Sequence, residues 1–72
     1  MIQYTEEQTR AYIIEARDYF GSKTFMADPE RIEQLSKFLG HLYLCCPEKL
    51  SMSVYGTLDE LNRREMMLTL RF

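Results

Sequence analysis

The chain has one histidine, two cysteines, three glycines and no tryptophan among its 72 residues. A phosphate-binding loop needs several glycines, and a structural zinc site needs four Cys or His ligands. The sequence also lacks the Cys-x-x-Cys, His-Glu-x-x-His and Gly-x-Ser-x-Gly motifs. We therefore expect a protein that is not an enzyme and that uses no metal or other cofactor.

Long apolar runs are missing as well. No run approaches the ~18 residues of a membrane span. The opening stretch MIQYTEEQTR has neither the basic nor the apolar region of a secretory signal. Because the two cysteines are adjacent, they provide no disulfide framework. We expect a cytoplasmic protein that works in a reducing environment and contacts no membrane.

The chain has no strong excess of either charge. Nine basic residues face eleven acidic ones, for a net charge of -2. Nucleic-acid binding normally needs a basic patch, so we expect no direct contact with nucleic acid. Residues 1–35 carry four basic and seven acidic side chains, whereas residues 36–72 carry five and four. If charge selects a partner, the acidic first half suits a basic surface.

The first strong pattern is a helix over residues 6–20. Thr5 and Gln8 have the spacing of a reciprocal capping box, and the acidic Glu6 and Glu7 suit the first turn. Gly21 stands where a left-handed helix end is expected. One arc of the helical wheel holds the apolar residues Tyr12, Ile13, Ala16, Tyr19 and Phe20. Ile14 falls outside that arc and is expected to be exposed.

A second helix is predicted to begin at Asp28 and Pro29 and to end before Pro47. Its apolar stripe comprises Ile32, Leu35, Phe38, Leu39, Leu42, Tyr43 and Cys46. Gly40 at the edge of the stripe would let a neighbouring backbone approach closely. The linker between the two helices is short, so an antiparallel helical hairpin is expected.

After Pro47 the apolar period changes from 3.6 to 2. Leu50, Met52 and Val54 alternate with polar or aromatic residues, and residues 66–72 alternate in the same way, which predicts two strands. Thr57 and Glu60 suggest a short helical segment between them. The alternative is a third helix from residue 58 to residue 70, whose wheel scatters several apolar side chains. Residues 1–4 could add a third strand.

The predicted fold is therefore α+β: one small globular domain, residues 1–72, with a helical hairpin packed on a small antiparallel β-hairpin. So small a sheet is marginal and has open edges, which predicts a partner and favours a homodimer. We expect a small interaction protein, acting as an inhibitor, adaptor or regulatory subunit by covering a partner's surface, for example a basic nucleic-acid-binding site. The predicted contact residues are Glu6, Glu7, Ile14, Glu15, Asp18, Tyr55 and Met67.

Two other interpretations stay open. Arg63 and Arg64 form a basic cluster that could hold a small anion or nucleotide at a dimer interface. His41 and Cys45 are four residues apart on one helix face, which is half of a zinc site that a dimer could complete. Packing is the simpler explanation for these thiols, since Cys46 lies on the apolar stripe and free cysteine is often buried.

Overall fold

The computed structural model describes the backbone of residues 3–70 and the side chains of residues 3–67. Within that range the chain is helical and contains no strand. The elements are α1 (Glu6–Phe20), α2 (Lys23–Met26), α3 (Pro29–Cys45), the 3-10 helix η1 (Glu48–Leu50) and α4 (Ser51–Leu70). The predicted α+β fold is therefore wrong, because a long helix takes the place of the sheet.

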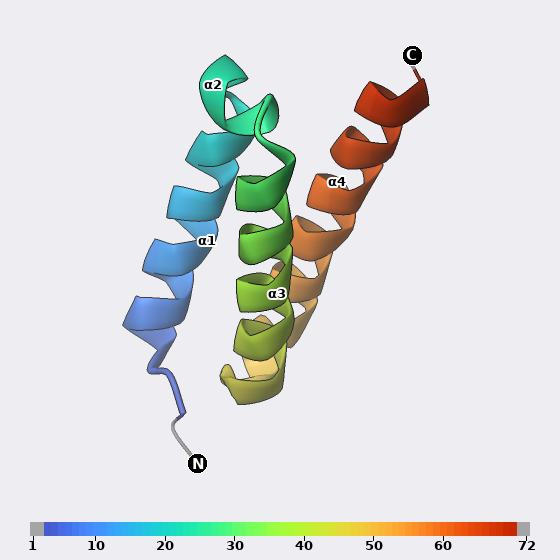
Figure 1. Cartoon of the computed structure of the whole chain (residues 1–72). Coiled ribbons are helices and arrows are strands. Elements are labelled where there is room, and N and C mark those ends of the chain that lie inside the picture. The colour runs from blue at the N-terminus through green and yellow to red at the C-terminus, as the bar shows by residue number, and fades with distance from the viewer. Residues whose placement is uncertain (1–2, 71–72) are drawn as a thin grey trace.

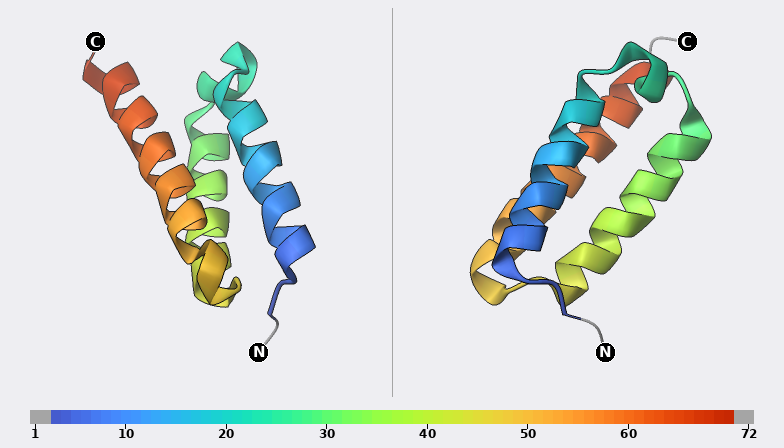
Figure 2. Two further views of the ribbon diagram at one scale, coloured as in Figure 1. Left: turned by 180° about the vertical axis from the view of Figure 1, so that it is seen from behind. Right: turned by 90° about the vertical axis from the view of Figure 1, so that its left-hand side faces the viewer.

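The three long helices form a bundle in which α1 and α4 run in one direction and α3 runs in the other (Figure 1). The two views of Figure 2 show that they are arranged as a triangle rather than as a flat layer. α3 packs most closely on α4. The short α2 lies at one end of the bundle and η1 lies at the other. The antiparallel direction of α1 and α3 is as predicted, but each of these helices packs more closely on α4 than on the other.

The helix ends follow the predicted signals. The Thr5 hydroxyl accepts from the Gln8 amide at 3.1 Å, and the Gln8 side chain accepts from the Thr5 amide at 3.0 Å. Asp28 caps α3 with Pro29 as its first residue, and α3 ends before Pro47. The prediction for Gly21 is wrong. Its φ is -84°, in the right-handed region, and its amide donates to carbonyls of the last turn of α1.

α4 is helical because its buried residues recur every three or four positions. The buried positions are Leu50 at the end of η1 and Val54, Thr57 and Leu61 in α4, and their spacing is that of one helix face. The Thr57 hydroxyl donates to the Ser53 carbonyl at 2.8 Å, so Thr57 lies inside the helix and does not begin one. The strands predicted after Pro47 are wrong. The alternative of a third helix was right in type, but α4 begins earlier, at Ser51.

The predicted third strand at residues 1–4 is not formed where it can be checked. Residues 1–2 and 71–72 lie outside the described residues, and residues 3–5 are irregular. The Tyr4 amide donates to the Cys45 carbonyl at 3.0 Å, which ties this segment to the end of α3. The Tyr4 ring meets Tyr12 and Phe38 edge to face, with centroids 5.5 and 6.5 Å apart. Aromatic rings thus pack between α1 and α3.

The linker between α1 and α3 contains a helical turn, α2, that was not predicted. Ser22 caps the single turn of α2 by accepting from the Phe25 amide at 3.2 Å. The Phe25 ring is buried and stacks on Tyr19 with centroids 4.6 Å apart. This turn therefore contributes to the core, whose buried members are Ala16, Phe20, Phe25, Ile32, Leu39, Leu42, Val54 and Leu61.

Candidate interaction surface

The histidine and cysteines lie at the last turn of α3. Nε2 of His41 is 3.8 Å from Sγ of Cys45, which is buried, while His41 is exposed. The Tyr4 ring meets the imidazole edge to face at 6.1 Å between centroids. Among the described residues, no group of three or more His, Cys, Asp or Glu side chains could hold a metal ion. The geometry is that of a packed helix end.

The burial of the two thiols differs from the burial that the apolar stripe predicts. Cys45 is the buried one, and Cys46 is only half-buried. Cys46 has already left the helix, with a φ of -87° and a ψ of 161°, and its thiol donates to the Tyr43 carbonyl at 3.4 Å. Because α3 ends one residue earlier than the stripe assumed, Cys46 is not one of the buried core residues. Both cysteines are free.

The acidic side of α1 begins with Glu6, which is neutralised inside the chain. Its carboxylate pairs with Lys49 of η1 and with Arg10, each at 2.7 Å. The hydrogen bond from Lys49, together with the charges of both cations, lowers the pKa of Glu6 below its ordinary value. This carboxylate therefore joins α1 to η1 rather than standing free for a partner.

The rest of that acidic side is also only partly available. Glu15 accepts a hydrogen bond from the Tyr19 hydroxyl at 2.8 Å, and that bond and the nearby carboxylate charge raise the pKa of Tyr19. Glu7 and Asp18 are exposed. Two of the four predicted acidic contact residues thus have partners within α1 or η1.

The predicted apolar contact residues are exposed but lie in different places. Ile14 borders a shallow hollow between α1 and the start of α4, where Leu50 and Ser53 also lie. Tyr55 lies on the side of α4 that faces the end of α3, since its ring is 5.9 Å from that of Tyr43. Met67 borders a cleft at the opposite end of α4. The structure does not bring these three side chains together.

The two arginines of the alternative site diverge as well. Arg63 pairs with Asp59 at 3.0 Å, and Arg64 pairs with Glu60 at 3.1 Å. Arg64 lies over the Phe20 ring at 5.5 Å and borders the cleft that Met67 also lines. Successive helix residues are about 100° apart, so only one of the two arginines faces this cleft.

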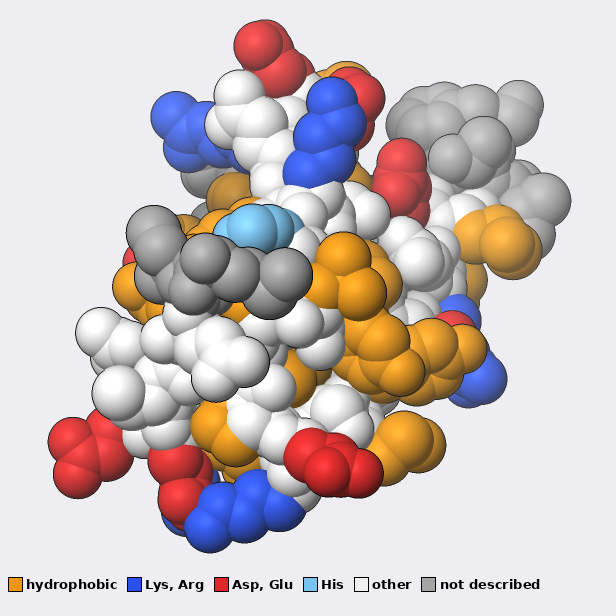
Figure 3. Space-filling view, turned by 90° about the horizontal axis from the view of Figure 1, so that it is seen from below, with side chains coloured by type: hydrophobic (Ala, Val, Ile, Leu, Met, Phe, Trp, Pro, Cys, Tyr) orange, Lys and Arg blue, Asp and Glu red, His pale blue; other side chains and the backbone are white. Residues whose placement is uncertain are grey.

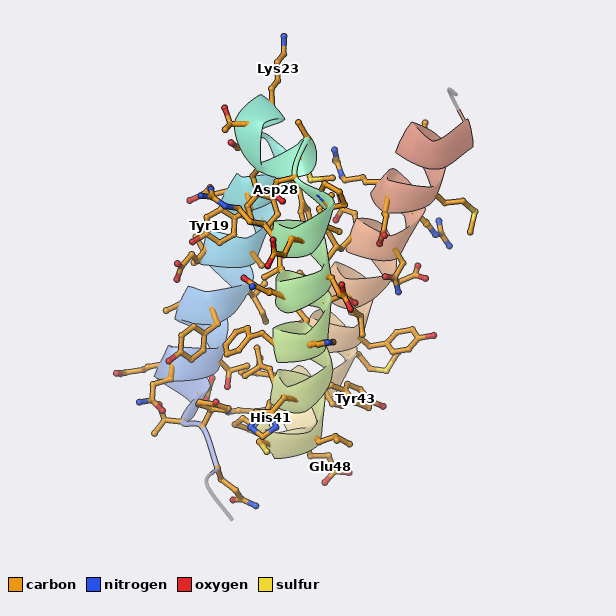
Figure 4. All side chains as sticks on the ribbon, in the orientation of Figure 1. Tyr19, Lys23, Asp28, His41, Tyr43 and Glu48 are labelled. Atoms are coloured by element: carbon orange, nitrogen blue, oxygen red, sulfur yellow. The ribbon has the colours of Figure 1, made fainter. Side chains whose placement is uncertain are left out.

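Four of the exposed large apolar side chains among the described residues lie where the end of α3 meets the start of α4. Figure 3 looks at that end of the bundle and shows hydrophobic side chains gathered on one side. In Figure 4, His41 and Tyr43 leave α3 on different sides, with Tyr43 toward α4. We call this surface the tyrosine patch. Its members, with their exposed fractions, are Tyr43 (39%), Leu44 (77%), Met52 (73%) and Tyr55 (51%).

Two glycines lie inside the helices that carry the tyrosine patch: Gly40 in α3 and Gly56 in α4. A Cβ at Gly40 or Gly56 would meet no atom of the described chain within 4 Å. Neither glycine has a positive φ. Glycine inside a helix costs about 0.5–1 kcal/mol relative to alanine. The packing of the described residues gives no reason for either one, and the close backbone approach predicted at Gly40 is not made within this chain.

The sequence analysis did not predict that three of the four residues of the tyrosine patch are exposed. Tyr43 was placed on the buried stripe, and Met52 was placed on the inner face of a strand. Leu44 lies about 100° away from Tyr43 on the α3 wheel, and that offset could have identified it as exposed. Met52 could be recognised only after residues 51–70 were known to be helical.

Comparisons with known proteins add nothing to this geometry: no protein-family model, no curated protein and no solved structure matches the chain significantly. Across residues 3–70, no helix combines the length and apolar character that crossing a membrane requires.

Proposed function

We propose that this protein is a small non-enzymatic interaction module that binds another polypeptide through the tyrosine patch. Such a module acts as an inhibitor, adaptor or regulatory subunit by covering a surface of its partner. The observation that carries the proposal is the exposure of four large apolar side chains on adjoining parts of α3 and α4, where the Tyr43 and Tyr55 rings meet at 5.9 Å between centroids. Contiguous exposed apolar groups of this kind mark interaction sites.

The side chains of the tyrosine patch and the two nearby glycines favour a helical partner. Aromatic and methionine side chains supply adaptable apolar contacts, which are typical of the centres of interfaces. Gly40 and Gly56 leave room for a partner backbone to come close to α3 and α4. A partner helix that lays its apolar face on this surface would bury the patch.

A second copy of the chain is the first partner that we propose. The charges on the same two helix faces are already balanced, because Glu33 pairs with Lys37 at 3.3 Å and Asp59 pairs with Arg63 at 3.0 Å. Two identical patches can therefore meet without like-charge repulsion. The two free cysteines suit the reducing cytoplasm, which is the compartment we propose.

The test is a double variant of the patch, Leu44→Ser with Met52→Ser, compared with a matched control, Ile14→Ser with Met67→Ser. The control removes side chains of similar exposure (63% and 61%) from other surfaces. We expect the patch variant to weaken self-association about tenfold, since truncating an interface anchor costs more than ~1 kcal/mol. Sedimentation equilibrium over a range of protein concentrations measures this constant.

The control variant should associate as the unchanged protein does. If the unchanged protein is monomeric throughout, the partner is a different protein, and its binding must be lost in the patch variant and kept in the control. If the patch variant and the control variant self-associate equally, and also bind a different partner equally, the tyrosine patch is not the contact surface. Circular dichroism establishes that each variant is folded.

A further inference from the structure

A cleft of about 240 Å³ lies at the end of the bundle opposite η1. It is open to solvent on one side and lined by the turn between α1 and α2 and by the second half of α4, and its apolar wall comes from Phe20, Met26 and Met67. Figures 1 and 2 show that α4 diverges from α3 toward its C-terminal end. The tyrosine patch is built from the other end of α3 and the first turns of α4, so the two surfaces are separate.

The rim of this cleft is cationic. The guanidinium of Arg64 lies over the Phe20 ring at 5.5 Å, and the Lys23 side chain also borders the cleft. In Figure 4 the Lys23 side chain extends freely from the top of α2. Its flexible stem allows the ammonium group to reach a ligand seated below it.

The carboxylate that pairs with Arg64 is shared with a second arginine. Glu60 pairs with Arg17 at 2.9 Å and with Arg64 at 3.1 Å. Of the residues that line the cleft itself, Lys23 and Arg64 are cationic and none is acidic. An anion bound at the rim could pair with these two cations.

We propose that the cleft binds a small amphipathic anion, a carboxylate on a short hydrocarbon chain. The carboxylate would meet Arg64 and Lys23, and the hydrocarbon would lie on Phe20, Met26 and Met67. The volume sets the size, since drug-sized ligands occupy pockets of about 300–1,000 Å³ and this cleft is somewhat smaller. This site is additional to the protein-binding surface and does not depend on it.

The experiment is a titration of the full chain with octanoate, followed by the amide resonances of the ¹⁵N-labelled protein. We expect saturable shifts at Gly21, Ser22 and Met67. The neutral probe 1-octanol, which has the same hydrocarbon chain length, should bind more weakly. Lys23→Gln should weaken octanoate binding about two- to fivefold, as expected for a solvent-exposed charge pair, and leave 1-octanol binding unchanged.

Lys37→Gln is the matched control, because it removes the same charge from α3 on a different surface and should not alter octanoate binding. Met67→Ser should weaken both probes, since it removes part of the apolar wall. The proposal is overturned if octanoate causes no saturable shifts, or if its shifts centre on the tyrosine patch. It is also overturned if 1-octanol binds as well as octanoate, or if the two lysine variants behave alike.

Discussion

In the first half of α4, Val54, Thr57 and Leu61 are fully buried, whereas the described side chains after Leu61, residues 62–67, are all exposed. The first half is held by apolar burial against α3 and α1. The second half is held by the pairing of Arg64 with Glu60 and by the contact of Arg64 with the Phe20 ring. One helix thus combines a segment fixed by the core with a segment fixed by weaker surface contacts, which border the cleft.

The largest difference in the free energy of unfolding is expected between Leu61→Ala and Met66→Ala. Leu61 has no exposed surface, so its truncation leaves a cavity and should lower the free energy of unfolding by about 2–5 kcal/mol. Met66 is 62% exposed, and its truncation should change that free energy by less than about 0.5 kcal/mol. Urea unfolding followed by circular dichroism measures both. Similar losses would contradict the division of α4 into two halves.

Gly56→Ala is expected to raise the free energy of unfolding by about 0.5–1 kcal/mol. The added Cβ meets open space, and the backbone already has a negative φ. The same methyl group should weaken association through the tyrosine patch if a partner backbone lies against α4 there. Thermal unfolding of dilute protein and sedimentation at high concentration separate the two effects. A loss of stability would show that Gly56 serves the fold itself.

Glu60→Gln should lower the free energy of unfolding by about 0.5 kcal/mol, because surface ion pairs contribute little. The carboxylate is about one-third exposed and serves two arginines, so its loss leaves Arg17 and Arg64 without their shared partner. High salt should reduce the difference from the unchanged protein. Arg63→Gln, which breaks only the separate pair with Asp59, is the control. A larger loss in the control would refute the role of Glu60 in holding this half of α4.

The smallest effect concerns Glu6, whose pKa is lowered by Lys49 and then by Arg10. A carboxyl group with a lowered pKa in the folded state stabilises that state above its unfolded pKa. The contribution of Glu6 should be complete above pH 4.5 and should disappear as the pH falls through the lowered folded value. Comparing melting temperatures of the unchanged protein and Glu6→Gln from pH 7 to pH 3 measures this. A difference that grows on acidification would contradict the assignment.

The ends of α1 and α3 could be predicted because they are encoded by local chemistry. Thr5 with Gln8 and Asp28 with Pro29 satisfy backbone amides at the start of a helix whatever the rest of the chain does. The left-handed turn predicted at Gly21 is wrong. A right-handed turn leads into α2 instead, because Ser22 supplies the cap of that short helix.

Strands were preferred to a helix after Pro47 for a reason that Thr57 explains. Leu50 and Val54 fit a spacing of four as well as an alternation of two, so the apolar residues alone do not decide between helix and strand. Thr57 decides it, but a threonine counts as polar in such patterns. Its hydroxyl is satisfied by the Ser53 carbonyl, and the side chain is therefore fully buried. Thr9 does the same in α1 by donating to the Thr5 carbonyl at 2.8 Å.

The candidate surfaces could be predicted only in part. Ile14 is exposed as predicted, and the predicted contact residues Tyr55 and Met67 are exposed too. Their separation could not be foreseen, because it depends on where each residue stands along α1 and α4. The tyrosine patch requires Tyr43 and Tyr55 to meet across two helices, and that contact is set by the packing of α3 on α4.

The neighbouring thiols at the end of α3 give the chain a built-in reporter of local opening. Cys46 is half-buried, whereas Cys45 is covered and its carbonyl is held by the Tyr4 amide. An alkylating reagent should therefore modify Cys46 first. The rate at which Cys45 reacts would then record how often the N-terminal segment detaches and the last turn of α3 unwinds.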